Sequence, residues 1–259
     1  MMTMPGARLA TDLKIIVLFA TRLPLAQKAP VQGGDIAHAS WAFPVVGAPL
    51  GAAGAFVYWA AFRIGLPPAP ASALALAATL AMTGCLHEDG LADTADGLGG
   101  GRPADRARKL EIMRDSRLGT YGASALAMSL LLRWSALAAI AEPALVAMAL
   151  VAAHGAARGA MPAFMRLVPP ARRDGLSANA GRPPLPSVGA AALLGIGMLG
   201  LGLGLFGAAI CLVLLAAASL LMARLAMNQI GGQTGDVLGA LEQAGEIVIL
   251  MTAAAIAKA

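Results

Sequence analysis

A continuous apolar run of some 38 residues, Val188–Leu225, constrains the fold of this chain more than any other feature. A helix needs roughly 20 mostly apolar residues to cross the hydrocarbon core of a bilayer, so this run is twice as long as one crossing requires. Hydrophobic residues make up 58% of the chain and charged residues 13%. Soluble domains carry about 25% charged residues. The chain is therefore predicted to be an all-α, polytopic integral membrane protein.

Apolar segments of spanning length occur along the whole chain and predict about seven transmembrane helices. The Gly-rich stretch from Gly200 to Gly207 is expected to divide the long run into a helical hairpin, which supplies two of these helices. All of them belong to a single integral membrane domain, residues 1–259. The predicted spans are Phe43–Phe62, Ala69–Leu86, Tyr121–Ala141, Pro143–Met161, Val188–Leu205, Phe206–Leu225 and Val237–Ile256.

The basic residues predict which loops face the cytoplasm. If segment 1–42 is cytoplasmic and the chain crosses seven times, sixteen of the nineteen Lys and Arg residues, Arg158 among them, fall in cytoplasmic segments. Cytoplasmic loops of membrane proteins carry such an excess of positive charge. We therefore expect a multi-pass protein of the bacterial inner membrane, in which segment 84–122 and loop 162–187 face the cytoplasm.

The net charge of +5 does not indicate nucleic-acid binding. The basic residues cluster beside the predicted spans and have almost no aromatic residues among them, unlike the stacking surfaces of nucleic-acid-binding proteins. Cys85 and Cys211 lie in apolar surroundings and are interpreted as packing residues. The expected partner is the lipid bilayer, and the sequence leaves the oligomeric state, a homo-oligomer included, open.

Half of the acidic residues gather in one polar segment, Gly84–Gly122, between two predicted spans. Asp89, Asp93 and Asp96 stand at positions i, i+4 and i+7, and on a helix they would project within about 60° of one another. Close carboxylates repel one another, and an all-oxygen ligand set suits Mg²⁺ or Mn²⁺. The spacing therefore predicts a divalent-metal site made by these three aspartates. The alternative is a solvated acidic helix start, which the helix dipole favours.

Residues suited to phosphate follow the three aspartates. Gly97 and the run Gly99–Gly101 permit close backbone approach and expose amides. Guanidinium groups match phosphate oxygens, and Arg102, Arg114 and Arg117 are the candidates. Carboxylates for a metal beside guanidinium groups for phosphate predict phosphoryl or nucleotidyl transfer. Anchoring to lipid headgroups is the alternative for the basic residues.

Five further polar residues are candidates for the site. Asp115 could be a fourth metal ligand, a general base or a helix cap. His87 could be a base, a ligand or a structural residue, and Glu88 beside it is a candidate for substrate binding. Asp236 lies at the mouth of the last predicted span and Glu246 in its first half, where ionisable groups are costly and usually functional. They are expected either to reach towards the metal site or to pair with basic residues of other helices.

Five segments of the sequence resemble a known family, the cobalamin synthases, which are adenosylcobinamide-GDP ribazoletransferases. The most specific are HEDGLADTADGLGGG (His87–Gly101) and LEIMRDSRLGTYG (Leu110–Gly122). The segments TRLPL (Thr21–Leu25), FPVVG (Phe43–Gly47) and GGQTGDVLGALEQAGE (Gly231–Glu246) agree with the family in the same order. The resemblance therefore covers the chain from near its start to its last predicted span.

Two other classes were weighed against this resemblance. The aspartate spacing is also similar to the signature of the CDP-alcohol phosphotransferases, which make lipids. The Arg that their pattern places after Ala92 is replaced by Asp93, however, and their later GxxxDxxxD pattern is missing. A membrane transporter is the second alternative. Transporters favour broken helices and internal repeats, and no convincing repeat occurs here.

The resemblance implies a Mg²⁺-dependent membrane transferase of late cobalamin biosynthesis. Its substrates would be adenosylcobinamide-GDP and α-ribazole or its 5′-phosphate, and it would release GMP. The three aspartates would hold Mg²⁺ on the diphosphate, and Arg114 or Arg117 would bind phosphate oxygens. Either Asp89 or Asp115 would be the general base, and the sequence does not choose between them.

Overall fold

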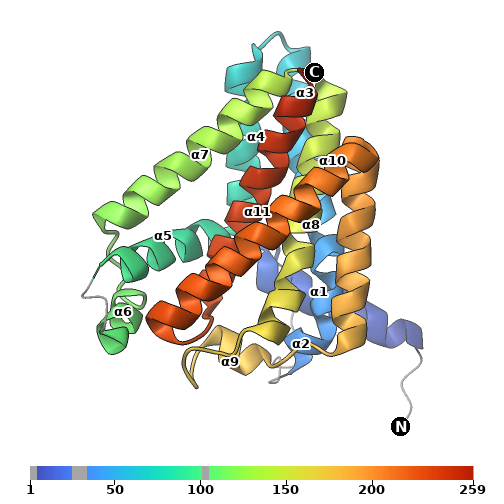
Figure 1. Ribbon diagram of the computed structural model, residues 1–259. Helices are drawn as coiled ribbons and strands as arrows, with labels where there is room; N and C mark the ends of the chain where they lie inside the picture. The colour runs from blue at the N-terminus through green and yellow to red at the C-terminus, as the bar shows by residue number, and fades with distance from the viewer. Residues whose placement is uncertain (1–4, 25–33, 101–104, 259) are drawn as a thin grey trace.

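The structure, a computed structural model, describes residues 5–24, 34–100 and 105–258. In these ranges the chain is helical and contains no β-strand, which confirms the all-α prediction. Most of the longer helices run up and down the molecule, and α5 lies across it (Figure 1). The α-helices are α1 (Pro5–Ala20), α2 (Asp35–Ala39), α3 (Phe43–Arg63), α4 (Pro68–Thr83), α5 (Leu86–Gly99), α6 (Arg106–Ile112), α7 (Thr120–Ile140), α8 (Pro143–Leu167), α9 (Leu176–Ala180), α10 (Leu185–Ile230) and α11 (Gly235–Ile256).

Five helical segments of the described ranges are long and apolar enough to cross a membrane, or six if α4 and α5 are counted as one bent span. They are α7, α8, α10, α11 and the run Asp35–Arg63, which ends with α3. α10 counts once here, although Gly204 interrupts its helical backbone with φ 69° and ψ 174°. Figure 1 shows the two arms of α10 at an angle to each other. The break falls within Gly200–Gly207 and confirms the hairpin, while the total of seven spans stays a prediction.

The predicted second span, Ala69–Leu86, is too long. Gly84 and Cys85 have left-handed backbone conformations, with φ of 63° and 57°, so α4 ends at Thr83. A regular right-handed helix cannot continue through two such residues. α5 then leaves at 89° to α4, and this turn carries the acidic residues of α5 across the bundle instead of along it.

The predicted cytoplasmic loop 162–187 begins too early. α8 continues through Pro162 to Leu167, and the loop starts at Val168. Proline cannot donate the backbone hydrogen bond that a helix interior uses. Phe164 and Met165 of the added turn are buried in an apolar cluster with residues of α10 and α11, and this burial offsets the missing hydrogen bond.

α8 is the central helix of the bundle and packs against α3, α10 and α11. A β-carbon on Gly47 or Gly51 of α3 would overlap the backbone carbonyl of His154 or Leu150 on α8. Small residues let the backbones of membrane helices approach closely, which strengthens their dispersion contacts. The main apolar core lies beside this crossing and includes the fully buried Tyr58.

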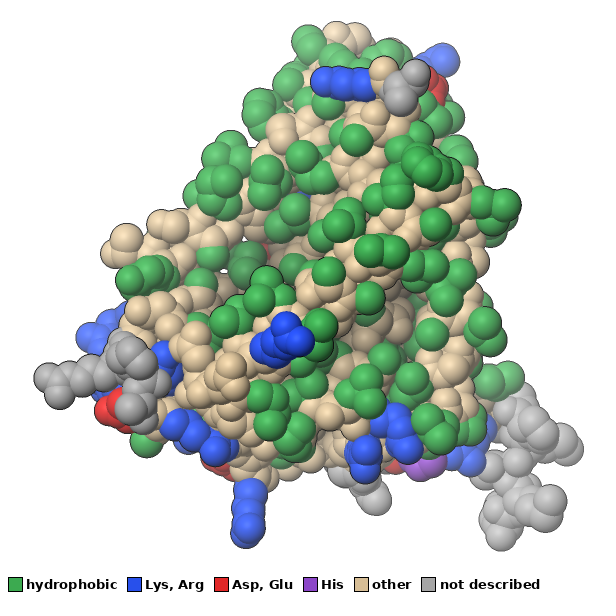
Figure 2. Space-filling view, in the orientation of Figure 1, with side chains coloured by type: hydrophobic (Ala, Val, Ile, Leu, Met, Phe, Trp, Pro, Cys, Tyr) green, Lys and Arg blue, Asp and Glu red, His purple; other side chains and the backbone are tan. Residues whose placement is uncertain are grey.

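The surface of the bundle divides into apolar flanks and a basic end. Hydrophobic side chains cover the flanks, and Lys and Arg side chains gather at the end that holds α6 and α9 (Figure 2). On α10, the side chains of Leu201, Leu205 and Phe206 are 82%, 89% and 76% exposed. Such an extended apolar surface fits lipid contact, so the described chain is a multi-pass membrane bundle.

Candidate active site

α5 reaches the start of α11 through a crossing of two glycines. A β-carbon on Gly90 would lie 2.9 Å from the backbone oxygen of Asp236 and 3.2 Å from the Cα of Gly239. Real β-carbons essentially never approach a backbone oxygen this closely, so only glycine fits here without moving a helix. The crossing places the aspartates of α5 beside the first turn of α11.

Asp89, Asp93 and Asp236 form what we call the outer acidic cluster. Asp89 is exposed and the other two are half-buried. Burial, and then the negative charges of Asp89, Asp236 and Asp96, raise the pKa of Asp93 to about 7. Within the described ranges, the structure gives the carboxylates of Asp89 and Asp93 neither a hydrogen bond nor an ion pair. The outer acidic cluster thus holds mutually repelling carboxylates with little positive charge to balance them.

A cavity of 130 Å³ lies beside the outer acidic cluster. Asp89 and Asp236 are among the residues that line it, and most of the other lining side chains are apolar. They include Phe19, Phe43 and Met161. Such a lining, mostly apolar with a few convergent polar groups, is typical of small-molecule sites, but the cavity is smaller than the roughly 300–1,000 Å³ of such sites and could hold only part of a large substrate.

Asp96 differs from the two aspartates before it on α5. Its Oδ2 accepts a hydrogen bond from the amide of Gly119 at 2.7 Å, and its Oδ1 accepts one from Gly122 at 2.8 Å. The first amides of a helix have no partner within the helix, and a carboxylate stabilises them. Asp96 therefore caps α7. Neither Asp96 nor Asp93 is among the residues that line the cavity, whereas Asp89 is.

Buried charges between α5, α7, α8 and α11 form a second group, the inner ionic network. Arg133 Nη1 lies 3.1 Å from Glu88 Oε1 and 2.9 Å from Glu246 Oε2. Arg158 Nη1 lies 2.5 Å from Glu242 Oε1 and 3.0 Å from Glu246 Oε1. Arg158 was counted above among the cytoplasmic residues, but it is 1% exposed inside the bundle, where these carboxylates compensate its charge. Glu88, a candidate for substrate binding, pairs with Arg133 of another helix. Glu246 pairs with Arg133 and Arg158, which is one of the two roles expected for it.

Two histidines extend the inner ionic network. His154 Nδ1 lies 2.6 Å from Glu246 Oε1, and His87 Nδ1 lies 3.6 Å from Glu242 Oε2. Three side chains of this network, those of His154, Glu242 and Glu246, could hold a metal ion, because one ligand atom of each lies within 4.8 Å of the others. In the described part of the chain, no other set of three His, Cys, Asp or Glu side chains meets this distance. Arg158 already provides positive charge beside both glutamates. Within the described ranges, the ligand atoms of Asp89, Asp93 and Asp236 do not all lie within 4.8 Å of one another.

The basic residues predicted to bind phosphate are engaged in exposed ion pairs. Arg114 Nη2 lies 2.5 Å from Asp174 Oδ2, and Arg117 Nη2 lies 2.5 Å from Asp115 Oδ2. The hydrogen bonds from Arg117 lower the pKa of Asp115 to about 2. A carboxylate with so low a pKa is a poor proton acceptor at neutral pH, which weakens the case for Asp115 as a general base.

Gly97 and Arg102 are the two other residues predicted to bind phosphate. A β-carbon on Gly97 would lie 3.2 Å from the backbone oxygen of Lys109 on α6. The absence of a side chain at Gly97 therefore serves the packing of α5 on α6. Arg102 lies outside the residues that the structure describes.

Arg172 was missed as a site residue, because a loop position has no periodicity that could place it. Its Nη2 lies 3.8 Å from Asp236 Oδ2. Its Nη1 is buried and has no hydrogen-bond partner in the described chain. Arg172 is thus the basic side chain that the structure brings to the outer acidic cluster. The run Arg172–Asp174, polar after an apolar helix, was the only signal in the sequence.

The fold and the site define a class of protein: a helical, multi-pass membrane protein with clustered carboxylates beside a cavity. The family model described as Cobalamin-5-phosphate synthase matches residues 12–254. The match covers nearly the whole chain. The chain therefore belongs to the cobalamin-5-phosphate synthase family, in agreement with the resemblance read from its sequence.

Curated relatives share most of their length with this chain. It is 62% identical to the adenosylcobinamide-GDP ribazoletransferase of Bradyrhizobium diazoefficiens, over 94% of this chain and 93% of that protein. The proteins of the same name from Mesorhizobium japonicum and Ralstonia nicotianae are 51% and 42% identical, over 97% and 92% of this chain and 96% and 93% of theirs. No solved structure matches. The chain is a transferase of cobalamin biosynthesis, and neither the lipid-enzyme nor the transporter alternative is supported.

Proposed function

We propose that this chain transfers the adenosylcobinamide phosphoryl group from adenosylcobinamide-GDP to α-ribazole or its 5′-phosphate. The names of the relatives supply the substrates. The outer acidic cluster is the observation that carries the proposal, because it brings uncompensated carboxylates to a cavity. Enzymes catalyse phosphoryl transfer mainly by positioning the reactants and by neutralising the charge that develops on phosphate oxygens.

Asp89 and Asp93 would hold Mg²⁺, with Asp236 close beside them. Their all-oxygen donor set fits this ion. Burial and then the neighbouring carboxylates raise the pKa of Asp93, and a cation would relieve the repulsion among these carboxylates. When bound, Mg²⁺ supplies neutralisation of the diphosphate charge. Asp96, expected from the sequence to be a third ligand, is proposed to act through α7, whose first turn it fixes beside α5.

Arg172 is the best placed side chain to bind a phosphate oxygen of the substrate. Its unpartnered Nη1 is a free donor next to Asp236, and guanidinium groups bind phosphate strongly. Arg114 and Arg117 would reach phosphate only by leaving their exposed ion pairs. Such pairs contribute little to stability, so both residues remain candidates for phosphate binding.

Asp89 is proposed as the general base because it lines the cavity, whereas Asp115 is held by Arg117. A ribose hydroxyl oxygen of α-ribazole would form the new bond to the phosphorus that carries cobinamide. The bond from that phosphorus to the oxygen of GMP would break, and the hydroxyl proton would pass to Asp89. The apolar and aromatic walls formed by Phe19, Phe43 and Met161 suit the flat base of the ribazole.

We also propose that the protein lies in the bacterial inner membrane with its α6 and α9 end in the cytoplasm. The Lys and Arg side chains at that end support this orientation (Figure 2), because cytoplasmic segments carry the excess of positive charge. Ser177 and Ala180, in and at the end of α9, line the cavity beside the outer acidic cluster. The proposed site would therefore be open to substrates from the cytoplasm.

The test is GMP release by the purified full chain in lipid vesicles, supplied with adenosylcobinamide-GDP, α-ribazole and Mg²⁺. We expect GMP and a corrinoid product in equal amounts, and no GMP once a chelator has removed divalent ions. Asp93→Asn is expected to lower the rate at least about 100-fold. Glu111→Gln, an exposed acidic position on α6, is the matched control and should keep the wild-type rate. GMP release by Asp93→Asn at that rate would remove the metal site from the mechanism.

A further inference from the structure

A second and larger cavity, of 710 Å³, lies between α8 and the two arms of α10. Its size is within the range of about 300–1,000 Å³ that small-molecule sites occupy. The break at Gly204 lets the arms of α10 diverge, and α8 forms the floor between them (Figure 1). We call this cavity the α8–α10 groove.

The α8–α10 groove faces away from the outer acidic cluster. None of the residues that line it also lines the smaller cavity. α8 separates the two, since Met161 and Met165 face the smaller cavity whereas Ala163 and Leu167 line the groove. Leu167 is 79% exposed, so the groove opens on an apolar flank of the molecule. A substrate in the groove could not reach the carboxylates, whereas a lipid could enter it from the bilayer.

The length of the groove matches one leaflet of a membrane. Its α8 wall runs from Ala156 to Leu167, which at 1.5 Å per residue is roughly 17 Å. Half of a hydrocarbon core about 30 Å thick is about 15 Å. An extended acyl chain can therefore lie along this wall, with the headgroup at one end.

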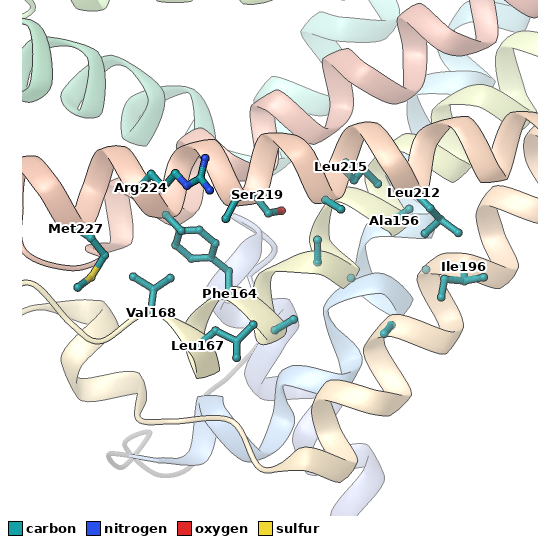
Figure 3. A pocket seen from close by; sticks show the side chains of 18 of the residues that line it. Ala156, Phe164, Leu167, Val168, Ile196, Leu212, Leu215, Ser219, Arg224 and Met227 are labelled. Atoms are coloured by element: carbon teal, nitrogen blue, oxygen red, sulfur yellow. The ribbon is translucent and has the colours of Figure 1, made fainter.

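The two ends of the groove differ in polarity. Figure 3 shows Arg224, Met227 and Val168 at one end and Ile196 and Leu212 at the other. Arg224 is the charged side chain among the lining residues. It is exposed, and within the described ranges it makes no ion pair or hydrogen bond. A cation at the end of an apolar groove of leaflet length suits an anionic headgroup.

We propose that the α8–α10 groove binds one anionic phospholipid, with an acyl chain along α8 and the phosphate beside Arg224. The apolar walls contribute affinity for the chain, and Arg224 selects for negative charge. One basic side chain near an anionic lipid is worth about fivefold in binding. The lipid fills the space between the arms of α10 and holds both against α8.

Native mass spectrometry of the purified full chain tests this proposal, with palmitoyl-oleoyl phosphatidylglycerol as the anionic probe. Phosphatidylcholine with the same chains is the zwitterionic probe. We expect one phosphatidylglycerol to bind about fivefold more tightly than one phosphatidylcholine. Arg224→Gln should remove this preference, whereas Lys258→Gln, exposed at the far end of the chain, should keep it.

A pair of volume changes tests the position of the lipid. Ala163→Phe fills the groove and should weaken the binding of both lipids at least about tenfold. Ala217→Phe adds the same side chain to α10 at an exposed position that does not line the groove, and it should bind both lipids like the wild type. Retained preference in Arg224→Gln or unchanged binding in Ala163→Phe would overturn the proposal. The same mass spectra report whether the chain forms dimers. If Ala163→Phe abolished dimers of the wild type and left lipid binding unchanged, a second copy of the chain would occupy the groove, and the proposal would be overturned.

Discussion

Two neighbouring residues of α5, Glu88 and Asp89, belong to two different groups of charged side chains. Basic side chains balance the carboxylates of one group and largely fail to balance those of the other. Glu88 enters the inner ionic network, where Arg133 and Arg158 lie against three buried carboxylates. Asp89 enters the outer acidic cluster, where carboxylates line a cavity and the nearest cation, that of Arg172, lies 3.8 Å from Asp236. α5 thus carries both an ion pair that joins helices and the carboxylates of the proposed site. The ion pair is balanced by a basic side chain, whereas the site carboxylates are largely unbalanced.

The difference follows from solvation. A buried charge that loses its partner costs several kcal/mol, so the inner ionic network has to be paired in the folded protein itself. The outer acidic cluster retains contact with solvent and can stay unpaired until a cation arrives. The comparison predicts that changes in the inner network affect folding first, and that changes in the outer cluster affect activity first.

Removal of an inner cation should have the largest effect on stability. Arg158→Met leaves Glu242 and Glu246 short of positive charge and should lower the free energy of unfolding by about 3–5 kcal/mol. Thermal unfolding in detergent measures the loss, with Arg108→Met, an exposed position on α6, as the control. Adding Glu242→Gln to Arg158→Met should recover part of the stability. An Arg158→Met variant as stable as the control would show that the inner network does not hold the helices together.

Much of this comparison could not be predicted from the sequence. The apolar runs and the glycines near Gly204 predicted the bundle and its hairpin, because span length and helix breaking are local properties. The spacing of Asp89, Asp93 and Asp96 predicted three equivalent carboxylates. Asp96 instead caps α7, and that depends on how a later helix approaches α5. Tertiary packing alone decides such a contact.

The partners of the buried charges were also beyond sequence reasoning. Arg133 had no partner at a suitable spacing on its own helix, and it finds Glu88 and Glu246 on two other helices. Arg172 lies in a loop that only the fold brings to Asp236. The resemblance correctly identified the family of the chain, and the functional role of the polar segment stays a prediction. It could not say which acidic residues pair and which stay free.

Without metal, the stability of the protein should depend on the protonation of Asp93. The pKa of Asp93 is raised from 3.8 to about 7 in the folded protein, so folding favours its protonated form. Its contribution to stability is complete below about pH 4 and is lost as the pH rises through about 7. In chelator, wild-type thermal stability should fall more between about pH 5 and about pH 8 than that of Asp93→Asn. Equal falls in the two proteins would mean that the pKa of Asp93 is not raised in the folded protein.

A change at the glycine crossing should affect the outer cluster without altering any charge. In Gly90→Ala the new β-carbon would lie 2.9 Å from the backbone oxygen of Asp236, so α5 and α11 must move apart. Small displacements of catalytic groups are costly, and GMP release should fall about tenfold. Gly197→Ala, which meets nothing within 4 Å on α10, is the control and should keep full activity. Full activity in Gly90→Ala would show that the crossing does not set the site.

The smallest effect is expected at the exposed ion pair of Arg114 and Asp174. The two side chains are 51% and 71% exposed, and such pairs contribute about 0–1 kcal/mol. Arg114→Gln should therefore leave thermal unfolding almost unchanged. A raised KM for adenosylcobinamide-GDP in this variant would assign Arg114 to phosphate binding, and an unchanged KM would leave Arg172 as the residue to test.

If the outer acidic cluster, and not the inner ionic network, holds the catalytic cation, the metal requirement should follow the ligand at position 93. Thiolate ligands prefer softer metals than carboxylates do. GMP release by Asp93→Cys is therefore compared in Mg²⁺ and in Cd²⁺, with the wild type beside it. We expect an inactive variant in Mg²⁺ and partial recovery in Cd²⁺, the reverse of the wild-type preference. Release by Asp93→Cys in Mg²⁺ at the wild-type rate would show that Asp93 does not hold the cation.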